Sequence, residues 1–126
     1  MRALVLTLSL VPFLIYAYRD TIYHLRQRKP GRAENLTHLA LGACQAAMIA
    51  GAYLGDVPRM ALAASGVAAF GVVDEHGFHH GLSNTESDLH AKAHLALFVF
   101  LAVGIALASF SSVDAFVAWV RQASHR

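Results

Sequence analysis

The sequence has little charge and almost no cysteine. Charged residues make up 14% of the 126 residues and hydrophobic residues 56%, with a mean hydropathy of +0.47, whereas about a quarter of a soluble domain is charged. The single cysteine, Cys44, excludes a disulfide framework. The chain has no glycine-rich phosphate loop or flavin fingerprint and no basic, groove-reading face, so we expect no nucleic-acid partner.

Apolar residues gather instead into long runs, at 3–18, 36–54, 57–73 and 93–110. Each run approaches the roughly 20 residues that a helix needs to cross a bilayer, and none shows the alternation of a barrel strand. We therefore predict an all-α fold, an integral membrane four-helix bundle in one transmembrane domain spanning 1–126. The predicted helices cover about 3–27, 34–54, 57–80 and 86–110, and the tail 111–126 is predicted to form a short interfacial helix.

Basic residues predict the orientation in the membrane. They concentrate in the connection after the first helix, and Lys92 is predicted to lie on the same side. Short loops rich in Lys and Arg remain in the cytoplasm, which places both termini outside, in a membrane of the bacterial inner-membrane type. The basic residues of that connection are Arg19, Arg26, Arg28, Lys29 and Arg32.

Histidines follow acids at a fixed spacing. The pairs are Asp20 with His24, Glu34 with His38, Glu75 with His79, and Glu86 with His90. Residues four apart share one helix face, and each predicted helix carries one pair. The first and third helices end, and the second and fourth begin, on the cytoplasmic side, so all four pairs are expected at one depth.

Imidazoles and carboxylates supplied by four helices are the ligand chemistry of a two-metal site. First-row metals suit such ligands, and iron with an open position permits oxygen chemistry. Glu34, Glu75 and Glu86 are also candidate catalytic bases, although Glu34 and Glu86 could simply favour helix N-termini. Asp20 and His24 take second place, because pairing with lipid headgroups is an alternative in their arginine-rich segment. The candidate ligands are His38, His76, His79, His80, His90, His94, Glu34, Glu75 and Glu86.

Two short motifs carry a resemblance to a known family. The segment 76–80, HGFHH, has the form H-x-x-H-H, and 90–94, HAKAH, has the form H-x-x-x-H. They resemble the histidine boxes of the membrane-bound di-iron hydroxylases and desaturases that act on fatty acids and carotenoids. The resemblance covers about 20 residues and implies two iron ions. The iron ligands that the resemblance implies are His76, His79, His80, His90 and His94.

The residues leave several functions open. The first is a metal-dependent membrane oxidoreductase acting on a lipophilic substrate or quinone and receiving electrons from another protein. A zinc hydrolase would use the same ligands with a carboxylate as general base. A b-type haem protein for electron transfer would use two histidines, such as His38 and His94. The last is a non-enzymatic accessory, either a small subunit of a larger membrane complex or a metal-binding carrier. The protein partner left open is such a complex or a second copy of the chain in a homo-oligomer.

Overall fold

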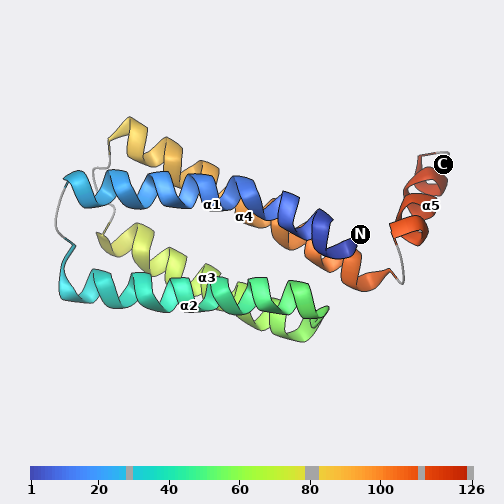
Figure 1. The fold of residues 1–126 in the computed structure, drawn as a ribbon. Helices are drawn as coiled ribbons and strands as arrows, with labels where there is room; N and C mark the ends of the chain where they lie inside the picture. Colours follow the sequence, from blue (N-terminus) through green and yellow to red (C-terminus); the bar gives the residue numbers. More distant parts are fainter. Residues whose placement is uncertain (28–29, 79–82, 111–112, 125–126) are drawn as a thin grey trace.

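The computed structural model describes residues 1–27, 30–78, 83–110 and 113–124, and every regular element within these ranges is a helix (Figure 1). The all-α prediction is confirmed, and the observed bounds lie within a few residues of the predicted ones. Predicted helical residues 79–80 lie outside the described residues. The helices are α1 (Arg2–Gln27), α2 (Arg32–Leu54), α3 (Val57–Phe78), α4 (Asn84–Ser109) and α5 (Val113–Ala123).

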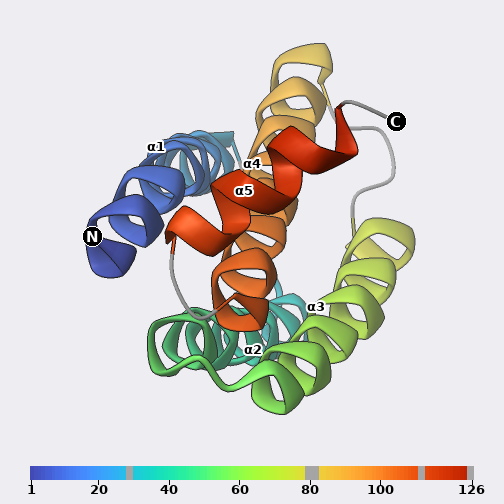
Figure 2. The ribbon, with the colours of Figure 1, turned by 90° about the vertical axis from the view of Figure 1, so that its right-hand side faces the viewer.

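The first four helices are long and apolar enough to cross a membrane, as the sequence predicts for a membrane bundle. Their exposed surfaces carry large apolar side chains, including Leu62, which is 78% exposed, and Leu39, which is 71% exposed. Such surfaces are stable against lipid rather than water. Helix α5 stands apart beyond the end of α4 (Figures 1 and 2), and its interfacial position stays a prediction.

The bundle is built from two antiparallel pairs of helices. Helix α1 packs along α4, and α2 packs along α3. The first and last of the four long helices thus form one pair, and the two middle helices form the other (Figure 2). The hairpin between α2 and α3 closes at Gly55, whose φ of 75° lies in the left-handed region. Glycine adopts this conformation without the steric cost of a Cβ atom, which allows the short connection between α2 and α3.

The two pairs meet at a tightly packed apolar core. Phe100 of α4, Met48 of α2, Met60 of α3 and Leu6 of α1 are all at most 1% exposed. A Cβ atom added to Gly104 of α4 would lie 3.1 Å from Cβ of Ala52 and 3.3 Å from Sδ of Met60. Close helix approach at small residues is how membrane helices gain packing energy.

Replacing Gly104 with leucine is therefore expected to destabilise the bundle. Overpacking a filled core costs about 1–3 kcal/mol, so the thermal midpoint of the purified protein in detergent should fall. Gly77→Leu is the matched control, because Gly77 is exposed and a Cβ added there meets no atom within 4 Å. Equal midpoints for the two variants would contradict the observed packing of α4 against the α2–α3 pair.

Candidate metal centre

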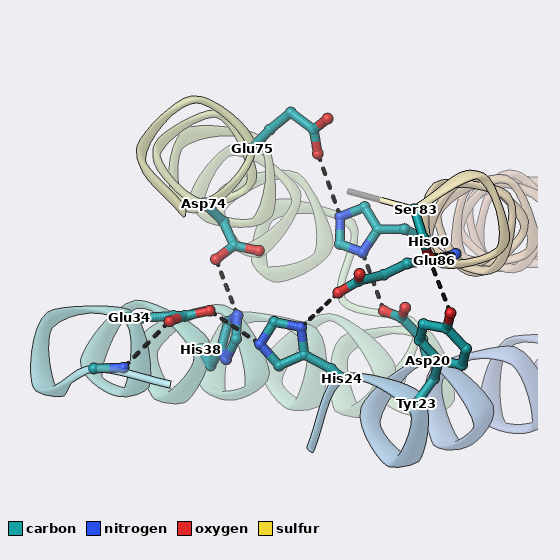
Figure 3. A network of polar contacts seen from close by, with 11 residues as sticks. Asp20, Tyr23, His24, Glu34, His38, Asp74, Glu75, Ser83, Glu86 and His90 are labelled. Carbon is teal, nitrogen blue, oxygen red and sulfur yellow. Dashed lines mark hydrogen bonds and ion pairs between the residues drawn. The ribbon is translucent and has the colours of Figure 1, made fainter. Parts of the chain in front are cut away.

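Acids and histidines of four helices meet at one end of the bundle. This is the end at which α1 and α3 finish and α2 and α4 begin (Figure 1), the common depth that the sequence predicts. We call the group the polar cluster (Figure 3). Its members are Asp20 and His24 of α1, Glu34 and His38 of α2, Asp74 and Glu75 of α3, and Glu86, His90 and His94 of α4.

His24 joins three helices. Its Nδ1 lies 2.9 Å from Oε1 of Glu86, and its Nε2 lies 3.0 Å from Oε1 of Glu34. The imidazole is 8% exposed, Glu86 is 7% exposed and Glu34 is 2% exposed. Burying a carboxylate is costly unless it is paired, so this three-residue arrangement links α1, α2 and α4 tightly.

A second contact links α2 to α3. Nε2 of His38 lies 3.0 Å from Oδ1 of Asp74, whose residue is only 1% exposed. The rings of His38 and His24 are edge to face, with centroids 5.5 Å apart. His38 therefore connects the buried aspartate of α3 to the imidazole of α1.

A third group of contacts centres on His90 of α4. Its Nδ1 lies 3.0 Å from Oδ2 of Asp20, and its Nε2 lies 3.6 Å from Oε2 of Glu75. The ring of His94, one turn further along α4, has its centroid 4.4 Å from that of His90. His90 thus joins α4 to both α1 and α3.

The acid–histidine contacts described above run between helices, although the sequence pattern places acid and histidine on the same helix. Side chains at i and i+4 share one face, and in the described pairs on α1, α2 and α4 that face points toward the neighbouring helices. In these pairs the acid at i and the histidine at i+4 each meet a partner from another helix. Asp20 and His24 illustrate this, since both reach α4, one at His90 and the other at Glu86.

Glu34 combines a capping role with its place in the cluster, whereas the side chain of Glu86 belongs to the cluster and Ser83 provides the cap. Oε2 of Glu34 accepts the backbone N–H of Gly31 at 3.2 Å, while Oε1 faces His24. At α4 the cap is Ser83, whose Oγ accepts the backbone N–H of Glu86 and lies 3.1 Å from the hydroxyl of Tyr23. The side chain of Glu86 is directed to His24 instead.

The structure changes the ranking of the candidate residues. It places Asp20 and His24 in the cluster, although sequence reasoning ranked them second, and it adds Asp74, which sequence reasoning missed. The signal for Asp74 in the sequence is a carboxylate that directly follows an apolar run and precedes Glu75. His76 is exposed on α3. His79 and His80 lie outside the described residues.

Three of these side chains have the geometry to hold a metal ion. Ligand atoms of His24, Glu34 and His38 all lie within 4.8 Å of one another. His24 and His38 line a cavity of about 330 Å³ that is also lined by Asp20, Asp74, His90 and His94. An ion at His24, Glu34 and His38 would have further nitrogen and oxygen donors across the same cavity.

Comparison of the chain with family models, with curated proteins and with solved structures gives no match. Its function must therefore be argued from the geometry of the polar cluster.

Proposed function

We propose that this protein is a membrane metalloprotein whose polar cluster holds transition-metal ions, and that it is an oxidoreductase acting on a lipophilic substrate. The observation that carries the proposal is the position of His24 between two buried carboxylates, Glu34 and Glu86. Imidazole nitrogens and carboxylate oxygens are both ligands of transition-metal ions. Ionisable side chains buried at this apolar depth are costly, and a bound metal ion is one way to compensate that cost.

The same two kinds of ligand recur throughout the polar cluster. A buried like-charged pair of carboxylates favours either a shared proton or a cation. Imidazole and carboxylate together suit iron, manganese and zinc. Donors from four helices suit two ions rather than one. The carboxylates of the cluster are Asp20, Glu34, Asp74, Glu75 and Glu86, and its imidazoles are His24, His38, His90 and His94.

Two iron ions fit the proposed activity best. Iron with an open coordination position would supply oxygen chemistry, and electrons would come from another protein because the sequence has no flavin or nicotinamide fingerprint. The haem alternative has less support, because Nε2 of the candidate axial ligand His38 faces Asp74 at 3.0 Å. We further propose that the cluster faces the cytoplasm and the termini lie outside, in keeping with the basic connection between α1 and α2.

The chain's own residues would orient the ligands. Asp74 holds His38 from α3, and Asp20 holds His90 from α1. Carboxylates that bond the second nitrogen of a ligating histidine fix its tautomer and direction. Glu75 is half exposed beside His90, which suits it to exchange protons between the cluster and the surroundings.

The test is the metal content of the protein purified in detergent, measured together with its absorption spectrum. About two irons per chain without a Soret band would support the proposal. Zinc alone would replace the oxidoreductase with a hydrolase or a structural site, and a Soret band would replace it with a haem protein. Protein that is folded yet binds none of these, after metal is resupplied, contradicts the metal centre itself.

A further inference from the structure

A second cavity of about 430 Å³ lies between α3 and α4. Its volume falls in the range of small-molecule sites, about 300–1,000 Å³. Among the described residues, those that line it belong to α3 and α4, which diverge toward the end of the bundle where α3 finishes and α4 begins (Figure 2). Its lining residues on α3 run from Val67 to His76, nine steps along the helix, which correspond to about 14 Å.

The lining changes from apolar to polar along its length. Val67, Leu97 and Phe98 line the deeper part, and Glu75, His76 and His90 belong to the polar end. Because α3 and α4 run in opposite directions, the polar residues of both helices lie at the same end of the cavity. A ligand that matches this lining has an apolar chain and a hydrogen-bonding head.

The two cavities share a wall. His90 and His94 line both the cavity between α3 and α4 and the cavity beside His24, Glu34 and His38. A head group at the polar end would therefore contact residues that also face the proposed metal centre. Such a wall places a ligand next to the cluster without opening the cluster to lipid.

We propose that the cavity between α3 and α4 binds an amphiphile with a flexible apolar chain and an uncharged carbonyl or hydroxyl head. His94 provides a hydrogen-bonding nitrogen to the head, and Glu75 accepts a hydrogen bond. A carboxylate head would be repelled by Glu75, which favours the uncharged head. Quinones and long-chain alcohols both have this chemistry. The role of the ligand as substrate rests on the proposed function, whereas its binding does not.

The rim of the cavity explains how such a ligand would enter. Val72 of α3 is 58% exposed and Phe98 of α4 is 61% exposed. Both positions lie within helices that are long and apolar enough to cross a membrane, so their exposed side chains would face acyl chains. The ligand enters sideways from the bilayer, with its head moving toward His90.

Gly71 provides a selective way to fill the cavity. It lies in the cavity wall, and a Cβ atom added there meets no atom within 4 Å. A leucine side chain at this position occupies ligand space without displacing a neighbour. Gly77 is the control, because it lies on the same helix with equally open surroundings and is not among the lining residues.

The experiment measures saturable binding of radiolabelled decylubiquinone and 1-dodecanol to the full chain in phosphatidylcholine nanodiscs, with empty nanodiscs as the blank. We expect the wild type and Gly77→Leu to bind, Gly71→Leu to bind at least tenfold more weakly, and dodecanoate to bind more weakly than dodecanol. Binding of decylubiquinone alone would assign the site to quinones, and binding of dodecanol alone would assign it to acyl alcohols. Absence of saturable binding, or unchanged binding by Gly71→Leu, overturns the inference.

Metal content of the same samples separates this inference from the proposed function. Gly71→Leu should retain the metal of the wild type, because Gly71 does not line the cavity beside His24. Probe binding by a folded protein that takes up no metal after resupply would contradict the metal centre and leave the amphiphile site intact. A metal-loaded protein that binds neither probe would overturn the amphiphile site alone.

Discussion

Replacing His24 with alanine is expected to abolish metal binding and to destabilise the bundle more than any other single change in the polar cluster. The substitution removes one ligand and also the partner that Glu34 and Glu86 share. Removing one member of a buried ion pair costs about 3–5 kcal/mol, because the remaining charge stays buried. Metal per chain and the chemical or thermal unfolding midpoint in detergent would measure the two effects.

The matched control is Asp88→Asn. Asp88 lies in the first turns of α4, as Glu86 does, but it is exposed and pairs with Lys92 on the same helix. Exposed pairs contribute about 0–1 kcal/mol, so this variant should keep both its metal and its stability. His24→Gln separates ligation from folding, because its side chain retains hydrogen-bonding groups. Full metal content in either folded His24 variant would refute the proposed site.

The sequence predicts the fold because long apolar runs leave few alternatives. A backbone surrounded by lipid must satisfy its own hydrogen bonds, and each run has the length of one spanning helix. Gly55 further marks where α2 ends, and Ser83 marks where α4 begins. These signals are local, so they can be recognised without knowing how the helices pack.

The polar cluster is predictable in depth but not in its pairing. Depth follows from distance along each helix, which is why Glu34, His38 and His90 are found together as expected. Pairing depends on how each helix is rotated and on which helix it packs against. The packing of α1 on α4 brings Asp20 to His90 and His24 to Glu86, and no spacing within one helix contains that information.

Asp74 shows the same limit from the opposite side. No histidine follows it at the fourth position, because residue 78 is phenylalanine, so the spacing pattern passes over it. Its partner is His38 on α2. A search for acids at matching depth on different helices would have found it, whereas a search along one helix could not.

Glu86→Gln distinguishes a cation site from a closed hydrogen-bonded network. In the metal-free protein, His24 lies between two carboxylates, and removing one charge relieves part of their repulsion while the amide oxygen can still accept from Nδ1. The metal-free variant should therefore be more stable than the metal-free wild type. With metal supplied, the wild type should be the more stable protein, because it binds the ion more tightly. The cap at Ser83 is unchanged, since it uses the backbone N–H of residue 86.

The measurement is the unfolding midpoint of both proteins with metal and after chelation. A ligand at a hundred times its dissociation constant stabilises a protein by about 2.7 kcal/mol, so chelation should lower the wild-type midpoint clearly and the variant's only slightly. The order of the two midpoints should then reverse, and Asp88→Asn should follow the wild type throughout. A network without metal predicts a different pattern, in which Glu86→Gln is less stable than the wild type under both conditions and chelation changes neither protein. The reversal therefore depends on a cation bound through the Glu86 carboxylate, as the proposed metal centre requires.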